Sequence, residues 1–154
     1  MKLSDHFTFE ELTATGQADL QQVNRDEAHA VAGDLTRVAR ELLEPVRVGM
    51  SLKVTVNSGY RGRTLNDRVG GSATSQHCLG QAADFNVEGY EDRKGQLAVL
   101  RWMVEYFEGK NYKWGQLLLE RGCIHASLGV KCEIAEYVVA TKTKSPIPEL
   151  ADLT

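Results

Sequence analysis

The spacing of apolar residues changes along this chain from a helical period to an extended one, and this change constrains the fold. Between about Arg25 and Leu43 apolar residues recur every three or four positions, as in an amphipathic α-helix with one buried face. From Val54 they alternate with polar residues, as in a half-buried β-strand. Helices followed by strands mixed with one further helix predict an α+β domain, with N-terminal helices packed on a largely antiparallel sheet.

Local patterns predict the remaining elements. A short helix is expected over residues 7–13, where Thr8 and Glu11 form a possible capping box. We expect Pro45 to help end the long helix. Further helices are expected at Thr64–Val69 and Asp92–Phe107, and further strands at Ala82–Val87, Gln116–Glu120, Cys123–Leu128 and Cys132–Ala140.

The length of 154 residues is that of one domain. We therefore expect a single domain over residues 1–154, with its core over about residues 5–140. An irregular C-terminal tail is expected over about residues 144–154, which contain Pro146 and Pro148. The cysteines are odd in number and have no CxxC spacing, so they indicate neither a disulfide framework nor a zinc finger. We interpret them as small buried apolar residues. They are Cys78, Cys123 and Cys132.

Charge and hydropathy exclude several classes of protein. Lys and Arg number 18 against 21 Asp and Glu, a net charge of −3. Because binding to nucleic-acid phosphates needs a basic face, we expect no nucleic-acid partner. No apolar run approaches the roughly 20 residues that span a bilayer, so no membrane insertion is expected. The N-terminus turns polar directly after Met1 and has no apolar signal core, which predicts synthesis in the cytoplasm.

Residues 58–84 concentrate chemically active side chains in a segment rich in Gly and Ser. Polar loops between rigid strands are where functional sites tend to lie. His77 is expected in the loop, and Asp84 follows it by seven positions, inside an apolar strand. An unpaired carboxylate would be costly there, so a metal ion or a strong hydrogen-bond donor is expected beside Asp84.

His125 stands in another strand-like segment. Two imidazoles and one carboxylate form a three-ligand set for Zn²⁺ that leaves a fourth position for water. Zinc lowers the pKa of that water to about 7, and a nearby carboxylate such as Glu120 can then take its proton. The spacing of His77 and Asp84 is weak evidence by itself, and a lone histidine on a strand, such as His125, is more often a hydrogen-bonded core residue than a ligand.

Several blocks in order along the chain resemble one zinc metallopeptidase family. It comprises the zinc D-Ala-D-Ala carboxypeptidases and the phage L-alanyl-D-glutamate endolysins, and the short single-domain branch is the most similar. The resemblance spans about residues 5–128. The blocks that carry it most specifically are Ser58-Gly-Tyr-Arg61, Asn66, Val69-Gly-Gly, Ser75-Gln-His77, Gly80-Gln-Ala-Ala-Asp84, Gln116-Leu-Leu-Leu-Glu120 and Ile124-His125-Ala-Ser127.

The resemblance implies a role for each matching residue. His77, Asp84 and His125 would bind zinc. Arg61 would hold the substrate or stabilise the developing oxyanion, and Ser75 would support the substrate or the ligand that follows it.

Two positions depart from the family pattern. Many members carry the catalytic glutamate three residues before the last histidine, where this chain has Gly122. Glu120 is then the candidate general base, matching the glutamate of the short branch. The short branch commonly has Trp where this chain has Cys123. Cys123 shares a strand face with His125, so it could approach the metal or be a packed core thiol.

The function that the resemblance implies is zinc-dependent hydrolysis of peptidoglycan stem peptides or cross-links, at L-Ala–D-Glu or D-Ala bonds. The expected partner is the peptidoglycan peptide, and the expected state is a monomer that acts on the cell wall or in the periplasm after release. Gly122 motivates an alternative: a weakly active or inactive wall-binding or virion module on the same fold. A zinc enzyme acting on a free dipeptide is a third reading.

Overall fold

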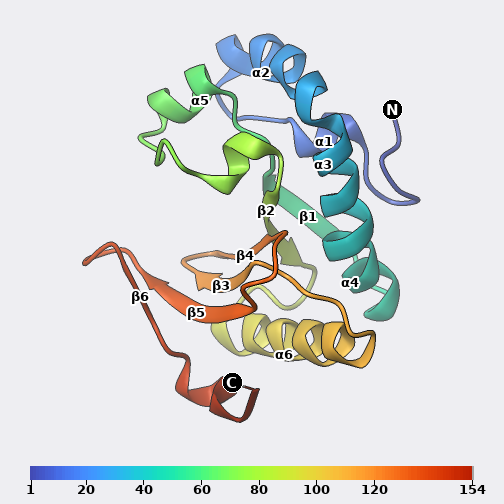
Figure 1. Cartoon of the computed structure of the whole chain (residues 1–154), viewed down its shortest axis with the longest axis vertical. Coiled ribbons are helices and arrows are strands. Elements are labelled where there is room, and N and C mark those ends of the chain that lie inside the picture. Colours follow the sequence, from blue (N-terminus) through green and yellow to red (C-terminus); the bar gives the residue numbers. More distant parts are fainter. Residues whose placement is uncertain (154) are drawn as a thin grey trace.

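A six-stranded sheet forms the centre of the computed structural model, which describes residues 1–153 (Figure 1). The strand order is β1-β2-β4-β3-β5-β6. All neighbouring pairs are antiparallel except β3 and β5, which are parallel. The predicted α+β class with a largely antiparallel sheet is therefore confirmed. The strands are β1 (Val54–Ser58), β2 (Ala82–Val87), β3 (Gln116–Glu120), β4 (Cys123–Ser127), β5 (Glu133–Val138) and β6 (Thr143–Ser145).

Most of the helical residues precede the second strand or lie between β2 and β3. The α-helices are α1 (Phe9–Leu12), α2 (Gln21–Ala28), α3 (Ala32–Arg37), α4 (Glu44–Gly49), α5 (Arg63–Arg68) and α6 (Arg93–Gly109). Single 3₁₀ segments are η1 (Ala18–Leu20), η2 (His29–Val31), η4 (Gln76–Leu79) and η5 (Pro148–Leu153), and η3 (Val38–Leu43) is a π-helical segment. No helix in residues 1–153 combines the length and the apolar character needed to cross a bilayer.

The long helix extends past both of its predicted ends, and the expectation that Pro45 helps end it is wrong. Helical segments follow one another from residue 21 to residue 49. The N–H of Glu44 donates to the carbonyl of Ala39, five residues back, in the wide turn of η3. Pro45 then lies in the first turn of α4, and the helical run continues past it although Pro45 has no N–H to donate.

The ends of the chain are anchored differently from each other. At the N-terminus the capping box of α1 is confirmed: Thr8 Oγ1 accepts from the Glu11 N–H at 3.1 Å, and Glu11 Oε2 accepts from the Thr8 N–H at 2.9 Å. The expectation of an irregular C-terminal tail is wrong, because residues 143–145 form β6 and residues 148–153 form η5. Burial of Ile147 and Leu150 in the core anchors this segment, which its two prolines had suggested to be irregular.

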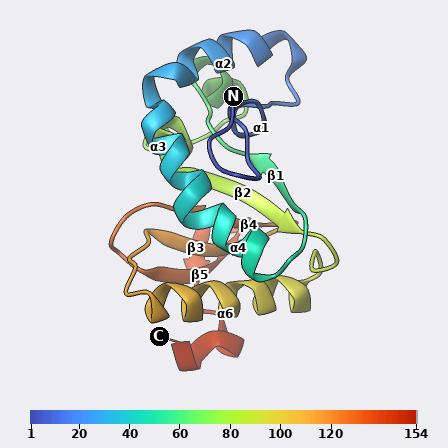
Figure 2. The same ribbon diagram turned by 90° about the vertical axis from the view of Figure 1, so that its right-hand side faces the viewer.

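The two faces of the sheet differ in chemistry. One face contributes Phe85, Leu117 and Ile124 to a single apolar core with η3 and α6, and all three are almost fully buried. Figure 2 shows the helical run from α3 to α4 crossing the sheet, with α6 beneath it. Side chains alternate between the two faces along each strand. Asp84 and His125 therefore lie on the opposite face, away from these helices.

Candidate metal centre

Strand pairing places Asp84 directly beside His125. The two residues are partners across β2 and β4, and Leu118 of β3 is the partner of His125 on its other side. Residues paired in this way point to the same face of the sheet. The Nδ1 atom of His125 lies 2.8 Å from Asp84 Oδ1. The third predicted ligand must therefore reach this point from outside the sheet.

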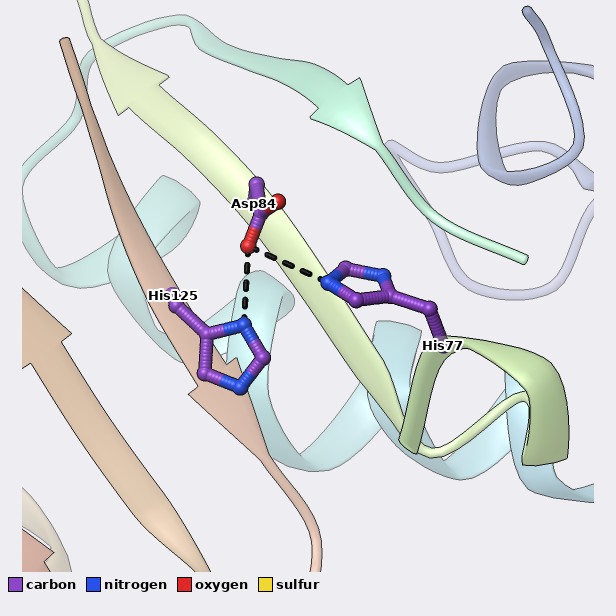
Figure 3. A group of neighbouring side chains, drawn as sticks. All are labelled: His77, Asp84 and His125. Carbon is purple, nitrogen blue, oxygen red and sulfur yellow. Dashed lines mark hydrogen bonds and ion pairs between the residues drawn. The ribbon is translucent and has the colours of Figure 1, made fainter. Parts of the chain in front are cut away.

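His77 reaches Asp84 from η4, in the connection between β1 and β2 (Figure 3). Ser75 caps this segment, with its Oγ accepting from the His77 N–H at 3.2 Å. Nδ1 of His77 lies 2.7 Å from the carbonyl oxygen of Gly59, to which it donates when it carries the proton. In that tautomer Nε2 carries no proton, and its electron pair is free to bind a metal. This atom lies 3.3 Å from Asp84 Oδ1.

The three side chains fit a zinc ion. Their candidate donor atoms all lie within 4.8 Å of one another. Tetrahedral zinc with bonds of about 2.0–2.1 Å separates its ligand atoms by about 3.3 Å, close to the spacings found here. Burial favours the neutral form of Asp84, but hydrogen bonds with His125 and His77 outweigh it and hold the pKa of Asp84 well below its usual range. The carboxylate is thus available in its charged, ligating form.

Glu120 borders the same group. It lies in β3 opposite Cys123, and its Oε1 is 3.7 Å from His125 Nδ1. Burial raises the pKa of Glu120, and the nearby charge of Asp84 adds to the rise. Gly122 forms the turn between β3 and β4 with φ of +84°, a conformation that favours glycine. Gly122 has no side chain, so the carboxylate that borders the centre is that of Glu120, two residues earlier.

Cys123 approaches Glu120 rather than a packed core. Its Sγ lies 4.0 Å from Glu120 Oε2, and its donor atom groups with those of Asp84 and Glu120. Burial, with the charges of these two carboxylates, raises the pKa of Cys123 to about 12, so the thiol stays protonated at neutral pH. The interpretation of the cysteines as small buried apolar residues is wrong, because Cys78, Cys123 and Cys132 are all half-buried.

Arg61 and Ser75 border the centre on the side of His77. An Nη2 hydrogen of Arg61 is donated to Ser75 Oγ at 3.2 Å, and the Arg61 N–H donates to the His77 carbonyl at 3.1 Å. The Nε atom of Arg61 is buried and has no hydrogen-bond partner within residues 1–153. Both predicted residues thus lie beside His77, the first candidate ligand, and both line the cleft described below.

The sequence analysis missed Asn24, which holds the backbone on both sides of Arg61. This buried side chain of α2 donates to the carbonyl of Tyr60 at 3.1 Å and accepts from the N–H of Gly62 at 2.7 Å. It also donates to the Thr13 carbonyl at 2.9 Å. The sequence offers one indication of its burial: Asn24 lies four residues before Ala28 and so on the apolar face of the long helix.

The centre opens into a cleft of about 730 Å³. Arg61, Ser75 and the three candidate ligands line it together with Glu120. The β5–β6 hairpin lines it as well, through Tyr137 and a set of lysines that the sequence analysis did not single out. These lysines are Lys131, Lys142 and Lys144.

Comparison with protein families matches residues 5–114 to the peptidase M15 family. The match contains His77 and Asp84 and ends before Glu120 and His125, which the fold brings to the same place. A search of curated proteins found no match. Since the match covers well over half of the sequence, the chain belongs to the peptidase M15 family of zinc-dependent metallopeptidases.

Proposed function

We propose that this protein is a zinc-dependent peptidase that hydrolyses peptidoglycan stem peptides or cross-links, at L-Ala–D-Glu or D-Ala bonds. The observation that carries the proposal is the convergence of His77, Asp84 and His125 beside Glu120 on the floor of one cleft. Membership of the peptidase M15 family supports the hydrolysis of a peptide bond. The peptidoglycan target is supported by the resemblance of residues 58–84 and 116–127 to enzymes that cut the wall.

The first part of the mechanism is the transfer of a proton. Bound zinc would supply a Lewis acid that lowers the pKa of a water molecule to about 7. Glu120 is the base that we assign to that water, because its carboxylate lies in the cleft beside His125. The raised pKa of Glu120 favours keeping the proton until it passes to the leaving amine.

The second part is the handling of negative charge. Arg61 lines the cleft with a guanidinium group that is held by Ser75 on one side. A fixed positive charge stabilises an oxyanion without having to reorganise during the reaction. We assign Arg61 to the carbonyl oxygen of the scissile bond, and Ser75 to the positioning of Arg61 and of the substrate.

Purified peptidoglycan provides the direct test. The zinc-loaded protein is incubated with it, and new peptide termini are identified by mass spectrometry with and without a chelator. We expect chelator-sensitive termini, whose identity names the bond. Zinc-loaded protein that binds the wall fragments and yields no new termini would establish the wall-binding alternative instead.

The Glu120→Gln variant tests the assigned base. We expect it to keep its zinc and to lose about 10²- to 10⁴-fold of the hydrolysis rate. Glu108→Gln, which removes an exposed carboxylate near the end of α6, is the matched control and should leave the rate unchanged. Normal hydrolysis by Glu120→Gln would place the general base elsewhere.

A further inference from the structure

The β5–β6 hairpin forms a basic wall of the cleft. Lys131 precedes β5, Lys142 lies in the turn between the two strands, and Lys144 is in β6. All three line the same cleft as the candidate metal ligands. These three lysines are called the lysine wall below. They stand C-terminal to residues 5–114, which match the family.

Strand pairing fixes this wall relative to the catalytic residues. β5 pairs in parallel with β3, so that Ala135 is opposite Leu118. Tyr137 follows Ala135 by two residues and is opposite Lys144 in β6. Since paired residues share a face, Lys144 and Tyr137 lie on the face of the sheet that carries Glu120 and His125. Figure 1 shows β5 and β6 as a hairpin at one edge of the sheet.

The lysine wall keeps an excess of positive charge. Glu133 is the acid that accompanies it, and its Oε1 accepts from Lys144 Nζ at 2.6 Å and from Gln116 Nε2 at 2.7 Å. Lys131 Nζ lies 4.0 Å from the same oxygen. Lys142 has no carboxylate within ion-pair distance in the part of the chain that the structure describes. One carboxylate thus faces three ammonium groups, in a chain whose net charge is −3.

Lys142 occupies a backbone conformation that a lysine rarely adopts. Its φ is +54°, in the left-handed region where glycine or asparagine is favoured. Its side chain is exposed and borders the cleft. The turn therefore tolerates a strained residue whose side chain is not needed for packing.

The other side of the catalytic centre carries no excess of positive charge, because acidic side chains outnumber basic ones there. A second cleft of about 420 Å³ borders the first, and Glu120 and Tyr137 line both. There Arg93 pairs with Glu136 and Glu149. A peptide lying across the centre would therefore meet excess positive charge on one side only.

We propose that the lysine wall binds a free carboxylate of the substrate peptide and so selects stem peptides that are acidic beside the scissile bond. This inference rests on the proposed function and adds its specificity. An ammonium group binds a carboxylate more strongly than the carboxamide of the same shape, because only the carboxylate adds the attraction of opposite charges. The substrate class is therefore a stem peptide with a free carboxylate on the residue beyond the bond, in preference to its amidated counterpart.

Two synthetic stem peptides that differ only in carboxylate or carboxamide at that residue test the proposal. Zinc-loaded wild-type protein and the double variant Lys131→Ala/Lys142→Ala are compared for KM and kcat on both. We expect the wild type to prefer the acidic peptide through KM, and the double variant to lose about fivefold of that preference with kcat unchanged. The preference should also weaken as salt is raised. Lys53→Ala, at the β1 edge of the sheet, makes a matched charge change and should retain the preference.

The possible outcomes separate this inference from the proposed function. Cleavage with an unaltered carboxylate preference in the double variant overturns the lysine wall and leaves the peptidase intact. If the wild type cleaves neither peptide, the dissociation constants of both peptides are measured by calorimetry on the same proteins. Equal dissociation constants in the wild type overturn the inference, whereas tighter binding of the acidic peptide that is lost in the double variant supports it.

Discussion

The two sides of the metal centre are held in place by different means. Asp84 and His125 stand opposite each other in adjacent strands, where many backbone hydrogen bonds fix the register. His77 lies in a loop segment, where its ring contacts the Gly59 carbonyl and its backbone is held by Ser75 and by the N–H groups of Arg61 and Gly80. The strand side therefore has redundant support, and the loop side relies on a few buried polar groups. This difference predicts where a single substitution disturbs the site most.

Asp84→Asn should have the largest effect, because Asp84 Oδ1 is the atom that both histidines approach. The amide keeps the shape and removes the charge that a cationic metal needs. We expect loss of bound zinc and a fall in hydrolysis of at least about 10³-fold, since the metal supplies several kcal/mol to the transition state. Metal analysis and rate measurements on the same sample check this, and an active variant with full zinc content would rule out the assigned ligand set.

Asn24→Ala should be the most damaging change on the loop side that touches no ligand. It leaves three backbone groups on residues 13, 60 and 62 without their buried partner. We expect a loss of about 2–4 kcal/mol in the free energy of unfolding. We also expect a ten- to hundredfold fall in kcat/KM through Arg61, with zinc content retained.

Asn66→Ala is the matched control for Asn24→Ala, because Asn66 is also buried and donates to the carbonyl of Ser72 instead. Urea unfolding and kinetics separate the two effects. A fall in kcat/KM as large in Asn66→Ala as in Asn24→Ala would contradict a specific role of Asn24 in holding Arg61.

Ser127→Ala probes the strand side in the same way and should cost less. Its buried Oγ accepts from the Gln116 N–H at 2.8 Å, a single contact next to an intact strand ladder. We expect a loss of about 1–2 kcal/mol in the free energy of unfolding and little change in kcat/KM. Thermal unfolding and the same kinetic assay measure both quantities. An effect on kcat/KM equal to that of Asn24→Ala would remove the contrast between the two sides.

Acid should produce the smallest effect, at the β5–β6 hairpin. The hydrogen bond from Lys144 lowers the pKa of Glu133 below its ordinary value of 4.5. Because the pKa is depressed in the folded state, this pair stabilises the protein above pH 4.5, and the contribution is lost as the pH falls through the folded pKa. We expect a loss below about 1 kcal/mol, since the pair is partly exposed. Lys144→Met should reduce this part of the pH dependence, and an identical pH profile for it would contradict the assignment.

The sequence predicted the strands of the site well, because each carries a strong local pattern. Ala82–Val87 was expected and observed with the same bounds, and Gly residues or turns delimit it and its neighbours. Asp84 and His125 were singled out as chemically unusual residues in such strands, and His77 in the polar loop before one of them. The structure brings these three together, as the resemblance implied.

What the sequence did not predict depends on contacts between distant segments. Pro45 was expected to help end a helix, and the π-helical turn before it has no simple sequence signature. The parallel pairing of β5 with β3 brings the lysine wall to the cleft. The alternation of apolar and polar residues predicts a strand but does not indicate which strand it pairs with, or in which direction. Asn24 could be identified only as a polar residue on an apolar helix face, with no indication of its partners.

The position of His125 across a strand ladder makes the metal centre sensitive to strand register. Asp84 and His125 are 41 residues apart, with α6 and β3 between them, so they meet only after β4 has paired with β2. A slip of one residue in that pairing would turn His125 toward the apolar core and Ile124 or Ala126 toward the cleft. We therefore expect zinc uptake to distinguish chains whose sheet has assembled in the native register from compact chains whose strands are misaligned.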